Sequence, residues 1–196
     1  MKQAITIIVV FLLGIGVGIG VDKYVLKDGG EKYTAVTIED SVKDIAELAV
    51  LENDYTDQEN WDGEAKQILG KDIPFTSKSV QLVYSGVIKA GPDMNKVKAD
   101  VNGKTINVVL PHSKILSHEI NEDSIVLVNV KNGIFNRVTP DNMNEVRKKA
   151  KESKEKRILE SDFLDQADEK AVNQVETFLK SAYADAEVNV KVDSVS

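Results

Sequence analysis

The distribution of apolar positions divides the chain into an N-terminal apolar segment and a longer region with the periodicities of helices and strands. Residues 4–21 carry no charge, and Thr6 is their one clearly polar member. As a helix, this segment would extend about 27 Å, close to the roughly 30 Å of bilayer hydrocarbon. We therefore predict a transmembrane anchor at residues 1–22 and a polar linker at residues 23–37.

A cleaved signal peptide is the main alternative for this segment, and a buried soluble helix is a weaker one. The stretch GVGIGVDKYV offers no Ala-x-Ala-like cleavage site, which favours an uncleaved anchor. Basic residues after the segment would favour a domain kept inside the cell. A very short N-terminal tail before an apolar run is instead typical of a signal anchor that exports the domain after it. We expect a single-pass protein of the cell membrane with an extracytoplasmic domain.

Past the linker, the pattern changes from helix to strand and back to helix. Thr37 is predicted to cap a short helix. Apolar and polar residues alternate within residues 79–138, which predicts a series of strands. Two Asn-Gly pairs, at 102–103 and 132–133, predict hairpins because both turn positions tolerate positive φ. Apolar residues recur at steps of three and four over residues 140–184, which predicts helices, and the alternation in AEVNVKV predicts a final strand.

These elements predict an α+β fold: a transmembrane helix, then an antiparallel strand meander packed with two C-terminal helices and a last strand. The folded domain is expected to span residues 38–196.

Composition narrows the possible chemistry of this domain. The 196 residues include no cysteine, which excludes disulfides, thiolate metal sites and a cysteine nucleophile. The formal net charge is −7, and nearly all charged residues follow the apolar segment. Such an acidic domain is a poor generic binder of nucleic acid, so we expect no nucleic-acid partner.

The glycines of FLLGIGVGIGVDK raise the question of a nucleotide-binding loop. A dinucleotide-binding motif needs Gly-x-Gly-x-x-Gly between a strand and a helix, and here Ile19 stands where the third glycine is required. On a helix the same residues form two Gly-xxx-Gly pairs, Gly14/Gly18 and Gly16/Gly20. These glycines are candidates for lateral helix association, with simple tolerance of glycine in a membrane helix as the alternative.

One basic segment interrupts the acidic domain. Its candidates for contact with an anionic surface are Arg147, Lys148, Lys151 and Arg157. Interleaved acidic residues favour another interpretation, in which this helix packs against the acidic helix that follows it.

No stretch assembles a recognisable catalytic motif. NGKT lacks the remaining glycine and the following helix of a phosphate-binding loop, and Ser153-x-x-Lys156 lacks its companion elements. His112 and His118, with Glu119, provide too few ligands for zinc. We predict no catalytic, cofactor-binding or metal-binding residues and a protein that is not an enzyme.

Several segments resemble the family known as domain of unknown function 4230. The similar positions include Tyr84-x-Gly86, Ala90-Gly91-x-Asp93 and Leu110-Pro111, within a region from about Ser41 to Val192. The resemblance implies an N-terminal anchor and one α+β domain, and it implies no reaction or cofactor. The order of elements is also similar to that of stomatin–prohibitin scaffold domains, an analogy of arrangement alone.

These observations favour a membrane-anchored scaffold or interaction domain at the cell surface. Its expected partners are the membrane, through the N-terminal helix, and another protein or a second copy of the chain. The alternatives are a domain that binds a small ligand or lipid and, with less support, a wall-modifying hydrolase that uses His112, His118 or nearby acids.

Overall fold

The computed structural model describes residues 33–193. The predicted anchor and residues 23–32 of the predicted linker lie outside the described residues, as do Gly14, Gly16, Gly18 and Gly20. Within residues 33–193, no helix combines the length and apolar character needed to cross a membrane. The residues from Ala35 onward form one compact unit.

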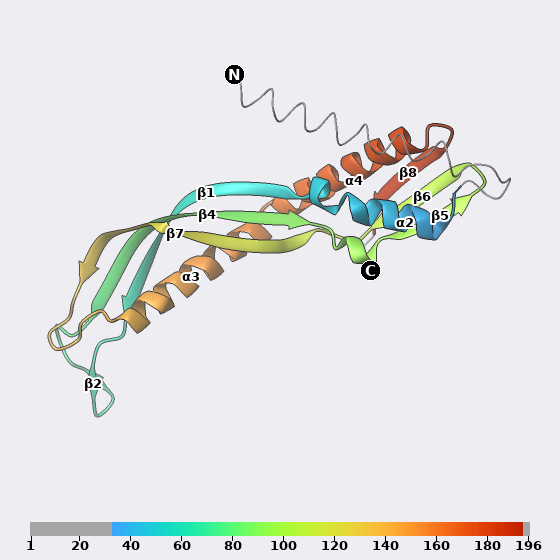
Figure 1. Cartoon of the computed structure of the whole chain (residues 1–196). Coiled ribbons are helices and arrows are strands. Elements are labelled where there is room, and N and C mark those ends of the chain that lie inside the picture. Colours follow the sequence, from blue (N-terminus) through green and yellow to red (C-terminus); the bar gives the residue numbers. More distant parts are fainter. Residues whose placement is uncertain (1–32, 194–196) are drawn as a thin grey trace, which may run out of the picture. The chain divides into compact units, whose positions relative to one another are not determined.

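The centre of this unit is a three-stranded antiparallel sheet with the order β1-β4-β7 (Figure 1). Its strands are long: β1 covers Leu51–Gly63, β4 covers Lys78–Gly91 and β7 covers Lys114–Lys131. Buried residues alternate along β4, as expected for a strand with one face against a core. Because β4 is central, β1 and β7 are the two edges of the sheet.

Helix α3 (Pro140–Leu159) covers one face of this sheet. Its start is specified locally, since Pro140 occupies the first turn and the Thr139 and Asn142 side chains form a capping box. Val146 and Ala150 are buried against the β4 residues Val80, Leu82 and Tyr84 together with other members of the core.

A second three-stranded sheet has the order β5-β6-β8. Strands β5 (Lys98–Asn102) and β6 (Thr105–Leu110) form the hairpin predicted at Asn102-Gly103, and β8 (Glu187–Val192) pairs parallel to β6. Helices α4 (Phe163–Ala182) and α2 (Ala35–Asp44) pack here, α4 along β8 and α2 on β5.

The shorter elements complete the described chain. They are η1 (Ala46–Ala49), β2 (Gln67–Ile68), β3 (Lys71–Asp72) and η2 (Met94–Lys96). Strands β2 and β3 form a small hairpin that extends from the end of the β1-β4-β7 sheet (Figure 1).

The structure confirms the α+β class, the antiparallel sheet, the two C-terminal helices and the last strand. The strands differ from one continuous meander, because the β5–β6 hairpin belongs to a separate sheet. The hairpin predicted at Asn132-Gly133 is wrong: the chain makes only an isolated bridge between Gly133 and Asn136. The segment closes instead as a compact loop, because the Val138 N–H donates to Asn132 Oδ1, and it leads directly into α3 at Pro140.

The start of the first described helix also differs from the prediction. Helix α2 begins at Ala35, so Thr37 lies within its first turn and is not its N-cap. Thr37 instead provides the backbone carbonyl that accepts a hydrogen bond from Ser41 Oγ at 2.9 Å.

Candidate functional site

A hydrogen bond between the two edge strands crosses the middle of the main sheet. The hydroxyl of Tyr55 on β1 lies 2.6 Å from Nε2 of His118 on β7. The bond passes over Gly86 of β4, which pairs directly with Tyr55. A Cβ at Gly86 would lie 2.5 Å from the Tyr55 hydroxyl and 2.5 Å from the Glu119 carbonyl oxygen. Only glycine at this position leaves room for the tyrosine to reach across β4.

Glu155 of α3 extends this contact into a chain of three polar groups. Its Oε1 lies 2.9 Å from Nδ1 of His118. An ionised carboxylate can only accept, so it places the histidine proton on Nδ1 and leaves Nε2 to accept from Tyr55. The His118 side chain is 1% exposed, and both of its ring nitrogens therefore have their partners inside the protein.

A second tyrosine packs against the first. The rings of Tyr55 and Tyr84 meet edge to face with centroids 5.9 Å apart, and the Tyr84 hydroxyl donates to the Ala150 carbonyl oxygen at 3.0 Å. Burial raises the pKa of Tyr84 to about 12, and the Asp57 carboxylate acts in the same direction. Burial is also the main reason why the pKa of Tyr55 is raised. Both phenols are therefore held in their neutral, hydrogen-bonding form.

Charged groups of α3 lie over this cluster. The ammonium of Lys154 is 4.3 Å from the centre of the Tyr55 ring and 3.8 Å from the Asp57 carboxylate. Arg157 also pairs with Asp57, and Lys149 lies 3.3 Å from Glu59 of β1. The acids of β1 and the bases of α3 thus form a row of ion pairs between strand and helix.

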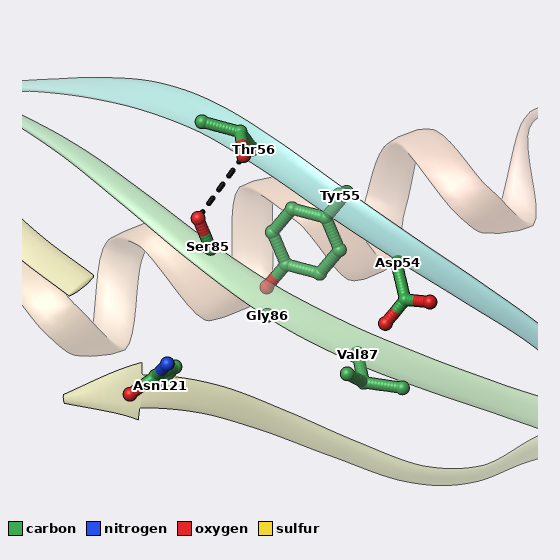
Figure 2. Close-up of a pocket in the computed structure, with 7 residues that line it drawn as sticks. All are labelled: Asp54, Tyr55, Thr56, Ser85, Gly86, Val87 and Asn121. Carbon is green, nitrogen blue, oxygen red and sulfur yellow. Dashed lines mark hydrogen bonds between the residues drawn. The ribbon is translucent and has the colours of Figure 1, made fainter. Parts of the chain in front are cut away.

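An open depression lies beside Tyr55 on the main sheet (Figure 2). It has a volume of about 340 Å³ and is lined from three strands by Asp54, Tyr55, Thr56, Ser85, Gly86, Val87 and Asn121. Thr56 and Ser85 share a hydrogen bond of 3.0 Å at its rim. Its lining mixes polar and apolar groups and does not include His118, so it differs from a deep apolar ligand cavity.

The other histidine lies in a separate cluster. Nδ1 of His112 is 2.7 Å from Oδ2 of Asp168 on α4, and Oδ1 of the same carboxylate accepts from the Ser113 backbone N–H at 2.7 Å. Oγ of Ser113 is buried and has no hydrogen-bond partner within the described part of the chain. His112 is therefore not arranged as a base for Ser113, and the carboxylate instead ties the start of β7 to α4.

Among residues 33–193, no group of three or more potential ligands comes together in a way that could hold a metal ion.

The predicted anionic-contact residues of α3 do not form one free basic patch. Arg147 lies 3.0 Å from Glu122 of β7, Lys148 lies 3.8 Å from Glu152, and Arg157 pairs with Asp57. Lys151 is exposed. Much of this basic charge is thus neutralised by acids of the strands and of α3 itself, and the predicted packing of α3 along α4 is only slight.

Large apolar side chains are exposed at one end of the main sheet. We call this set the strand-end surface; it consists of Ile68, Leu69, Phe75, Val126, Leu127, Val128, Val130, Ile134 and Phe135, each at least 40% exposed. The segments are held together, since the Ile134 N–H donates to the Phe75 carbonyl oxygen at 2.8 Å. Asn136 Nδ2 adds a bond to the Thr76 carbonyl oxygen at 2.6 Å. The surface is thus built on a defined framework.

The strand-end surface also contains residues with an unusual backbone conformation. Three non-glycine residues among those described have positive φ: Leu69 (53°), Phe75 (64°) and Phe135 (56°). Bulky residues rarely adopt this region because it is strained. All three side chains are exposed, by 97%, 81% and 88%. At Leu69 the positive φ is that of the two-residue turn between β2 and β3, where glycine or asparagine is the usual residue. Bulky apolar side chains are thus exposed at positions where a small turn-forming residue would cost less.

The sequence pattern did not reveal the two most distinctive features. No local pattern connects Tyr55 or Glu155 with His118, because 63 and 37 residues separate them from it. The uncharged run Ser124–Val130 could have indicated an exposed edge, since its apolar residues do not alternate.

The described region is thus an α+β domain built on a long antiparallel sheet with an exposed apolar end. The family model Protein of unknown function (DUF4230) matches residues 40–190, and the chain belongs to this family. No curated protein and no solved structure matches the chain.

Proposed function

We propose that this protein is a membrane-anchored, non-enzymatic interaction domain that acts on the extracytoplasmic side of the cell membrane. The observation that carries the proposal is the strand-end surface, where apolar side chains are both exposed and, at three positions, strained. Exposed apolar patches on soluble domains commonly serve as binding sites.

The polar clusters support a structural role more than a catalytic one. The His118 side chain is buried between Tyr55 and Glu155, so a substrate would have to displace an existing partner to reach it. The His112–Asp168 pair is more accessible, but its carboxylate is already engaged by a backbone N–H. The uncharged segment at residues 4–21 supports the membrane anchor.

The test uses the full chain in a deletion strain of its own host. The double variant Phe75→Gly/Phe135→Gly removes two exposed rings at positions where glycine tolerates positive φ. We expect its free energy of unfolding to stay equal or to rise by about 1 kcal/mol, because strain is relieved and little burial is lost. We expect the same variant to lose complementation of the deletion phenotype.

Val36→Ser provides the control, since Val36 is 66% exposed but lies on α2. This variant should complement fully. A folded double variant that complements as well as the wild type would overturn the proposal.

Contact with an anionic membrane is a second candidate function, favoured by local charge. Residues 64–78 and 131–137 contain five basic side chains and two acidic ones, although the chain as a whole is acidic. Apolar tips flanked by lysine and arginine are typical of segments that enter a membrane interface.

A further inference from the structure

We infer that the strand-end surface binds a second copy of this chain, through antiparallel pairing of β7 with β7 of the partner. The two sheets would then join into one sheet with the strand order β1-β4-β7-β7-β4-β1. This inference rests on the proposed function, because it names the occupant of the surface.

The two edges of the main sheet are protected to different degrees. β1 has five acidic residues and no basic one, so two β1 strands would repel each other: Glu52, Asp54, Asp57, Glu59 and Asp62. Two lysines also donate to backbone carbonyl oxygens at this edge. Lys149 donates to Asn60 of β1, and Lys170 donates to Val50, the residue before β1, each at 2.6 Å. Charged side chains on an edge strand prevent pairing with another chain.

β7 lacks these protections over its second half. Ser124–Val130 contains no charged residue, and Val126–Val130 is exposed throughout. In the described chain no strand pairs with the outer side of β7. The unpaired backbone groups on that side, beside apolar side chains, form a template for adding another strand.

Charge specifies the register of the pair. If Leu127 lies on the two-fold axis, Val126 faces Val128 of the second copy, and Asp123 faces Lys131. The apolar residues then meet in the centre, and an ion pair of opposite charges closes each end. Cross-strand pairs of both kinds stabilise an antiparallel ladder. An isologous contact of this type closes as a dimer. Anchoring both chains in one membrane would raise their effective concentration.

The test exploits the absence of cysteine from the chain. Leu127→Cys in the full-length protein, in membranes, should give a disulfide-linked dimer upon mild oxidation, since residues facing each other in a ladder come close enough to bridge. Asn60→Cys is the matched control, because Asn60 is an exposed residue on the opposite edge of the same sheet. We expect several-fold more dimer from Leu127→Cys than from Asn60→Cys.

A charge reversal tests the register. Asp123→Lys in the Leu127→Cys background should lower the dimer yield, and adding Lys131→Asp should restore it, because the ion pairs are then re-formed in the opposite sense. Equal dimer yields from Leu127→Cys and Asn60→Cys would overturn the inference, and absence of rescue would overturn this register.

These outcomes are separate from the test of the proposed function. If Leu127→Cys forms no dimer but Phe75→Gly/Phe135→Gly still abolishes complementation, the surface binds something other than a second copy. If complementation survives in that folded variant, the proposed function itself is wrong.

Discussion

The hydroxyl of Tyr55 on β1 meets Nε2 of His118 on β7 at 2.6 Å, across a strand that separates them. The contact fixes the distance between the two edges of the main sheet at its middle. Because Glu155 of α3 holds the other ring nitrogen of His118, the same chain of bonds also attaches the helix to the sheet. These bonds therefore hold both edges of the sheet and α3 together at the middle of the sheet.

Gly86→Ala should destabilise the domain, because its Cβ would occupy space filled by the Tyr55 hydroxyl. We expect a loss of about 1–3 kcal/mol in the free energy of unfolding, typical of overpacking. Urea unfolding measures this, with Ser85→Ala on the same strand as the control, expected to change stability by less than about 0.5 kcal/mol. Equal effects of the two substitutions would show that the close approach of the Tyr55 hydroxyl to Gly86 does not contribute to stability.

Tyr55→Phe should weaken the fold and leave the biological activity intact. The change leaves Nε2 of His118 buried without its donor, which costs about 1–3 kcal/mol. A catalytic tyrosine would instead show lost activity in a protein that remains folded. Complementation by the full-length variant, at a temperature where it is folded, distinguishes the two. Lost complementation at full folding would favour the hydrolase alternative.

Alkaline pH should destabilise the domain between pH 10 and about 12. An unfolded tyrosine ionises near pH 10, whereas burial raises the pKa of Tyr84 to about 12. The folded state then binds more protons than the unfolded state, so stability is fully present below pH 10 and decreases as pH rises through this window. Urea unfolding at several pH values measures the slope. Tyr84→Phe should flatten it, and an unchanged slope would exclude this tyrosine as a cause.

Binding to anionic vesicles should depend on the end of the main sheet and not on α3. Lys66→Glu/Lys71→Glu changes two exposed residues near the strand-end surface and should reduce binding at low salt. Arg147→Gln/Arg157→Gln should have less effect, because acids of the sheet already neutralise both guanidinium groups. Co-sedimentation over a salt series measures both, and the opposite ranking would restore α3 as the candidate surface.

Local signals in the sequence predicted most of the elements correctly. Asn102-Gly103 predicted a hairpin, Pro140 the start of helical structure and the alternation of AEVNVKV the last strand, because each depends on neighbouring residues. The same reasoning failed at Asn132-Gly133, where Asn132 Oδ1 accepts from the Val138 N–H and closes a compact loop. A turn signal specifies that the chain reverses, but it does not specify that the residues after the turn form a strand.

The arrangement of the strands and the candidate site depend on contacts distant in sequence. Nothing local to β6 indicates that it pairs with β8, which lies about 80 residues later. Likewise, Asp57 and Glu59 are ordinary acids of a strand until α3 brings Arg157 and Lys149 to them. The strand-end surface was not predicted because its defining property is lack of cover, which only the complete packing of α3 reveals.

The most direct test of the central claim is amide hydrogen exchange of residues 124–131 in the full-length chain in membranes. If the strand-end surface is covered in use, the N–H groups of this segment that do not bond to β4 exchange slowly in the wild type and fast in Val126→Lys, where a charge on the edge blocks pairing. Exchange in β1, the opposite edge, should be the same in both and thereby shows that Val126→Lys is folded. Fast exchange of these same N–H groups in both proteins would contradict the account.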